Sequence, residues 1–147
     1  NYIKGVTYML KKIPKILSPE LVKILMEMGH GDEIVLADGN FPSESMGQRT
    51  TRADGHGVPE LLAAILELMP LDTYAQPVYL MAKVPGDNVE VPIWDEYAKL
   101  IAPHTDAKVE FLERFEFYER AKKAYCVVAT GESAIYANVI LKKGVVK

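Results

Sequence analysis

The chain has 147 residues, of which 49% are hydrophobic and 25% are charged, and its formal net charge is −3. This length predicts one domain that buries about 70% of the surface of its unfolded chain, and the composition excludes disordered and fibrous classes. The acidic balance argues against a nucleic-acid partner, and no apolar run is long enough to span a bilayer, so we also expect no membrane partner.

The first eight residues, NYIKGVTY, are unlike the rest of the chain. A natural start is "MLKKIPKILSPEL" from Met9, so we interpret 1–8 as an N-terminal extension or cloning remnant and 9–147 as the domain. No signal-peptide pattern opens the chain, and its single cysteine, Cys126, cannot form an internal disulfide. These features predict a cytoplasmic protein with a buried thiol.

Helix and strand patterns alternate along the chain. The first helix has Ser18 as its N-cap and Pro19 at its first position, and Gly29 fits the left-handed residue that ends it. Further helices are predicted at 59–69, 92–102 and 114–124. Strands are predicted at 34–37, 49–55, 77–84, 108–113, 124–130 and 134–144, and residues 39–48 are predicted to form a loop. The alternation is typical of an α/β domain with helices over a parallel or mixed sheet.

Two polar residues flank the predicted strand 34–37. His30 enters it, and because histidine titrates near neutral pH this residue is a candidate general acid or base; the alternative is a loop histidine that binds its neighbours. Asp38 lies at the carboxyl end, where α/β sheets bind ligands, and could hold a ligand hydroxyl; the alternative is a carboxylate that caps backbone amides. The strand would separate the two by up to about 15 Å, so they need not act on the same atom.

Aromatic and polar side chains occur together near the C-terminus. In "RFEFYER", Phe115 and Tyr118 fall at helical spacing and are predicted to face the core. In the last predicted strand, Tyr136 and Asn138 share one face and Ala137 points to the other. An aromatic ring beside hydrogen-bonding groups suits the apolar face and the hydroxyls of a sugar. The alternative interpretation is that these residues form the solvent-exposed polar face of a strand.

Several catalytic motifs are missing from the sequence. It contains no dinucleotide-binding GxGxxG, Walker A, GxSxG or zinc-ligand spacing. Any enzyme here is therefore expected to use acid–base chemistry with no cofactor and no metal. Two alternatives stay open, namely a sugar-binding module without turnover and a divalent-metal hydrolase built on His30, Asp32 and Asp38.

Five ordered blocks resemble the L-fucose mutarotase family, which is related to D-ribose pyranase. They run from Met9 to about Val145 and read LSPELVKILMEMGHGDEIVLADGNFP, RADG, RFEFYERAKKA, TGE and YANVILKKG. The resemblance implies a three-layer α/β/α domain that assembles into ring-shaped homo-oligomers, decamers or octamers. It also implies cofactor-free interconversion of the anomers of a free monosaccharide, most simply L-fucose. A pyranase-type interconversion of ribose pyranose and furanose forms is the alternative.

The same resemblance assigns roles to residues. It makes His30 the proton donor and Asp38 a substrate-binding residue. Other substrate-contacting positions match Arg114, Tyr136, Ala137 and Asn138. Tyr118 is a candidate second acid–base group, although a packed helix aromatic is an equally simple interpretation. Sites near subunit contacts would bring His30 and Asp38 of different copies together.

Overall fold

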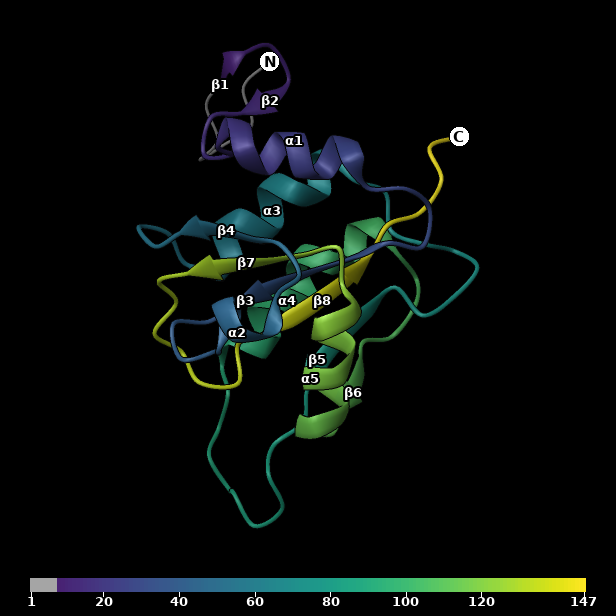
Figure 1. The fold of residues 1–147 in the computed structure, drawn as a ribbon. Coiled ribbons are helices and arrows are strands. Elements are labelled where there is room, and N and C mark those ends of the chain that lie inside the picture. Colours follow the sequence, from purple (N-terminus) through teal and green to yellow (C-terminus); the bar gives the residue numbers. More distant parts are fainter. Residues whose placement is uncertain (1–7) are drawn as a thin grey trace.

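A computed structural model describes residues 8–147, so residues 1–7 of the predicted extension lie outside the described residues. The strands are β1 (Tyr8–Leu10), β2 (Ile13–Pro14), β3 (Glu33–Ala37), β4 (Thr50–Ala53), β5 (Val78–Met81), β6 (Glu110–Leu112), β7 (Cys126–Thr130) and β8 (Val139–Lys142) (Figure 1). The helices are α1 (Pro19–Glu27), α2 (Ser43–Met46), α3 (Val58–Leu68), α4 (Ile93–Ile101), the 3₁₀ turn η1 (Ala102–His104) and α5 (Arg114–Lys123). None of the helices in this described part is long and apolar enough to cross a membrane.

A six-stranded mixed sheet forms the centre of the domain, in the order β4-β7-β3-β8-β5-β6. Strands β4, β7 and β3 run parallel, β8 is antiparallel between β3 and β5, and β5 is parallel to β6. The carboxyl ends of β3, β4 and β7 therefore meet at one edge of the sheet, the place where open α/β sheets form ligand crevices.

Helices cover both faces of this sheet. Along β3, Ile34 and Leu36 belong to a core cluster that includes side chains of α1, α3 and α4. The alternate residues, Val35 and Ala37, belong to a second cluster with Phe41 and side chains of α5. All five β3 residues are buried, which explains why the strand reads as a nearly continuous apolar run. The expected α/β domain with a central sheet is confirmed.

The four predicted helices are present, but local details differ from the sequence analysis. The predicted loop 39–48 contains the short helix α2, and the β1–β2 hairpin was missed. Gly29 does not take the left-handed conformation; Gly31 does, with φ 88°, because α1 ends on an extended Met28 and the chain turns later. Of the predicted strand 134–144, only β8 (Val139–Lys142) is a strand in the structure.

The inward face of α5 also differs from the prediction. The side chain of Phe115 is 61% exposed, whereas Phe117 is fully buried together with Ala121, one turn further on. The Glu113 side chain accepts the amide N–H groups of Phe115 and Glu116, so the helix begins at Arg114. This start fixes which side faces the sheet and leaves the Phe115 ring in solvent.

The Cys126 thiol is fully buried in the larger core cluster, as predicted, and burial raises its pKa to about 11. We expect Cys126→Ser to lower the free energy of unfolding by about 1–2 kcal/mol, because a hydroxyl replaces sulfur in an apolar site. Catalytic rates should stay unchanged. Denaturant unfolding of Cys126→Ser, with Cys126→Ala as the comparison, measures the change in the free energy of unfolding. An unchanged free energy of unfolding for the serine variant would contradict this prediction.

Candidate active site

Asp38 follows β3 directly and is only 5% exposed. Its carboxylate accepts the Asn40 N–H at 3.0 Å and the Ala137 N–H at 3.3 Å, and its own N–H donates to Asn138 Oδ1 at 2.7 Å. Burial raises the pKa of Asp38, although the amide donors oppose the shift. Asp38 therefore both caps backbone amides, the alternative considered above, and ties the end of β3 to the segment that precedes β8.

A hollow of about 330 Å³ opens beside Asp38, at the lower end of the range for small-molecule pockets. It is lined by Asp38, Asn40, Phe41, Pro42, Met81, Asp87, Tyr118, Ile135, Tyr136 and Asn138. We call it the Tyr136 hollow. Its lining includes four of the residues predicted for the site, namely Asp38, Tyr118, Tyr136 and Asn138. Ala137 is fully buried and contributes its backbone amide to Asp38.

Two side chains in the Tyr136 hollow keep free hydrogen-bonding capacity. Within the described part of the chain, the Tyr118 hydroxyl and the Asn138 Nδ2 group form no hydrogen bond, while the Tyr118 ring packs edge-on against Phe41. Tyr136 and Asn138 do not share a strand face as predicted, since they precede β8 and Tyr136 turns with φ 54°. A turn, not a strand, directs both side chains into the hollow.

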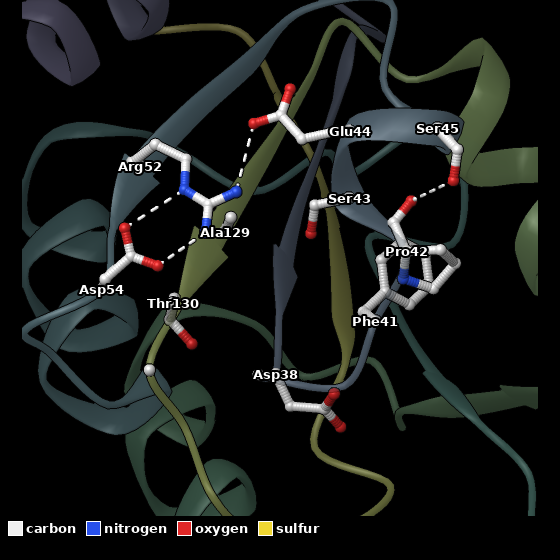
Figure 2. A pocket seen from close by; sticks show the side chains of 12 residues that line it. Asp38, Phe41, Pro42, Ser43, Glu44, Ser45, Arg52, Asp54, Ala129 and Thr130 are labelled. Carbon is white, nitrogen blue, oxygen red and sulfur yellow. Dashed lines mark hydrogen bonds and ion pairs between the residues drawn. The ribbon is translucent and has the colours of Figure 1, made fainter.

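A second hollow of about 550 Å³ shares Asp38, Phe41 and Pro42 with the Tyr136 hollow. Figure 2 shows Ser43 between Arg52 on one side and Phe41 and Pro42 on the other, with Thr130 and Asp38 lower in the view. The Arg52 guanidinium forms ion pairs with Asp54 at 2.7 Å and Glu44 at 3.1 Å. These bonds use three of the five N–H donors of Arg52 and hold its guanidinium between the two carboxylates.

His30 lies at the opposite end of β3. Its Nε2 contacts Asp72 Oδ1 at 2.9 Å, and its ring packs against Tyr74 with centroids 5.3 Å apart. The Asp72 side chain is 3% exposed and that of His30 is 45% exposed, so a fixed carboxylate orients an accessible imidazole. Burial raises the pKa of Asp72, but hydrogen bonds from His30 and the Tyr74 amide outweigh this and hold it below its usual value. An accessible imidazole held in one orientation by a buried carboxylate suits His30 for proton transfer.

The structure does not bring all the predicted residues together in one protomer. The five residues of β3, which extend about 16 Å, separate His30 from Asp38. Arg114 is exposed at the start of α5 and stacks on Phe115, with Cζ 4.7 Å from the ring centroid, outside both hollows. His30, Asp32 and Asp38 do not converge, and no group of three or more possible metal-ligating side chains occurs among residues 8–147.

Asp72, Met81 and Asp87 are among the residues of these sites that the sequence analysis missed. Asp72 lies 42 residues from His30 along the chain, and Met81 and Asp87 belong to β5 and the segment after it. "LDTY" carries a signal only for a local turn, in which Asp72 accepts the Tyr74 N–H. No spacing rule could have joined it to His30, because the pairing depends on how α1 and α3 pack on the sheet.

The fold and sites define an α/β domain with a small polar pocket at the carboxyl edge of its sheet and a separate histidine–carboxylate pair. Residues 11–146 match the RbsD / FucU transport protein family, and the chain belongs to this family. It is 54% identical to the fucose mutarotase of Danio rerio over 144 residues, which cover 93% of this chain and 94% of the relative.

Two solved structures resemble the domain closely. A fucose mutarotase from Streptococcus pneumoniae, crystallised in complex with L-fucose, superposes with a TM-score of 0.89 at 54% identity and covers 94% of this chain and 100% of its own. RbsD from Bacillus subtilis, complexed with D-ribose, superposes with a TM-score of 0.71 at 28% identity and covers 89% of this chain and 95% of its own.

Proposed function

We infer that this chain is an isomerase that interconverts the α and β anomers of L-fucose by opening and re-closing the sugar ring. The observation that carries this inference is the match, over nearly the whole chain at 54% identity, to a fucose mutarotase crystallised with L-fucose. The Tyr136 hollow supports it, because it offers an aromatic ring, an amide and a carboxylate to a ligand rich in hydroxyls.

The reaction needs two proton transfers and no redox step. A proton goes to the ring oxygen as its bond to the anomeric carbon breaks, and a proton leaves the anomeric hydroxyl as the carbonyl forms. Re-closure on the other carbonyl face inverts the anomer. We assign the donated proton to His30, oriented by Asp72, and the sugar hydroxyls to Asp38 and Asn138. Tyr118, which lines the Tyr136 hollow, is the proposed second acid–base group.

The separation of His30 from Asp38 favours a site shared between copies of the chain. We propose a ring-shaped homo-oligomer, a decamer or octamer, in which His30 of one copy reaches the Tyr136 hollow of the next, and Arg114 adds donors to a sugar there. Exposed apolar side chains, including Met26, Phe115 and Ile135, supply surface for such contacts. We assign the assembly to a reducing cytoplasm on the basis of the free buried thiol.

Saturation transfer between the anomeric protons of L-fucose tests the activity directly. We expect enzyme-dependent exchange that survives EDTA, and slower exchange for D-ribose in a matched tube. Loss of exchange on chelation would overturn the cofactor-free mechanism. Faster exchange of ribose would favour the pyranase-type alternative, which the likeness to the ribose complex supports. Binding of L-fucose without any exchange would identify a sugar-binding module instead.

A further inference from the structure

The segment between β5 and α4, residues 82–92, has no regular helix or strand, and in Figure 1 it is the long teal loop that projects furthest from the domain. Its turn carries Gly86 in the left-handed region with φ 89°, directly before Asp87. Nothing in the sequence marks this loop as part of a site. The structure connects it to the Tyr136 hollow, because Asp87 lines that hollow with Asp38, Tyr118 and Asn138.

Contacts from this loop and from the start of α4 hold Tyr136. The Tyr136 hydroxyl donates to Asp87 Oδ2 at 2.7 Å and accepts the Val84 N–H at 3.1 Å. The Trp94 Nε1–H donates to the Tyr136 carbonyl at 2.8 Å, and the two rings lie 6.4 Å apart. The loop thus accepts a hydrogen bond from the hydroxyl of Tyr136 and donates one to its phenolic oxygen.

This support matters because the Tyr136 backbone is strained. Its φ of 54° lies in the left-handed region, which residues with a Cβ atom rarely adopt unless the surroundings hold them there. The Asp87 carboxylate is itself fixed, since its Oδ1 accepts the Val89 N–H at 3.2 Å. Hydrogen bonds from Tyr136 and the Val89 amide lower the pKa of Asp87, so the carboxylate is charged at neutral pH. A charged acceptor makes the bond to the phenol a strong one.

We propose that Asp87 is a positioning residue for the sugar: it fixes the Tyr136 ring as a wall of the pocket and, with residues 82–92, determines how tightly the monosaccharide is held. The proposal rests on the proposed function, since it assigns the Tyr136 hollow to a sugar. Asp87 acts through Tyr136 and takes no part in proton transfer, so its loss should weaken sugar binding and leave the chemical step unchanged.

Four variants test the proposal, namely Asp87→Ala, Asp87→Asn, Tyr136→Phe and the double variant Asp87→Ala/Tyr136→Phe. We expect Asp87→Ala and Tyr136→Phe each to raise the KM for L-fucose about tenfold, with kcat changed less than about twofold. Asp87→Asn keeps an oxygen acceptor for the phenol and should restore most of the affinity. The double variant should be no worse than either single one, because both remove the same bond.

Glu90→Ala is the matched control, since Glu90 is an exposed acid on the same loop. It should leave KM unchanged, which separates the Tyr136 contact from the loop's overall charge. A normal KM for Asp87→Ala, or losses that add in the double variant, would overturn the proposal.

Trp94 gives a second readout that does not depend on turnover, because it is the single tryptophan of the chain and contacts Tyr136. L-Fucose should change its fluorescence in the wild type, and Asp87→Ala should shift the titration midpoint about tenfold higher. If the wild type binds L-fucose without exchanging its anomers, the mutarotase function fails while this midpoint still decides the role of Asp87. If the wild type neither binds nor exchanges L-fucose, both proposals are overturned.

Discussion

His30→Ala should lower the rate of L-fucose anomer exchange roughly 10²- to 10⁴-fold, the usual contribution of a positioned acid–base group. The imidazole is half-exposed, and among the described residues its side-chain hydrogen bond is to Asp72. His30 lies before the first residue of β3, and the pair lies outside the core clusters. Removal of the imidazole leaves these clusters intact, so folding and assembly should persist. Saturation transfer measures the rate, and thermal unfolding with sedimentation measures the fold and the assembly.

His56→Ala is the control for this experiment, because His56 is also half-exposed and also faces a carboxylate, Glu60 at 3.5 Å, but lies away from the His30–Asp72 pair. It should keep wild-type exchange. Asp72→Asn should give an intermediate rate, since the amide oxygen can still accept a hydrogen bond from the ring but holds it less firmly than a carboxylate does. A folded His30→Ala protein with near wild-type exchange would remove His30 from the mechanism.

Local sequence signals predicted the elements that depend on local physics. Ser18 caps α1 through the Leu21 N–H, and Pro19 begins the helix, both as expected. The apolar run before Asp38 is a buried strand because both sheet faces are covered. These features follow from capping chemistry and periodicity, and they placed His30 and Asp38 at the two ends of β3.

The remainder depends on contacts between distant segments. Tyr136 was predicted on a strand because its neighbours alternate in polarity, yet the loop after β5 holds it in a turn. Asp72 and Asp87 have partners 42 and 49 residues away, and no local pattern encodes such pairs. In "RFEFYER", Tyr118 packs against the smaller core cluster as predicted, whereas Phe115 is exposed and Phe117 takes the buried position instead.

Asp38→Asn should weaken L-fucose binding about 10- to 100-fold, because a charged acceptor for sugar hydroxyls is lost. The pKa of Asp38 is raised in the folded chain, so its contribution to stability is present at low pH and is lost as the pH rises through the folded pKa. Asparagine does not titrate, so the variant should gain stability relative to wild type as the pH rises above about 4, the ordinary pKa of an aspartate. This trend, followed by thermal unfolding, distinguishes a binding defect from a folding defect.

Mixing the His30→Ala and Asp38→Asn variants, assayed at L-fucose concentrations well below the wild-type KM, decides whether the site is shared between copies. If His30 of one copy serves Asp38 of another, assemblies co-expressed from His30→Ala and Asp38→Asn chains contain both native residues in about one site in four. Exchange should then recover to about a quarter of the wild-type rate. Co-expression of His30→Ala with the double variant His30→Ala/Asp38→Asn is the control, because no such assembly holds any native histidine at position 30. Recovery only to the sum of the residual activities would mean that each copy carries its own complete site. His30 and Asp38 of one chain, which β3 separates by about 16 Å, would then have to act on the same sugar.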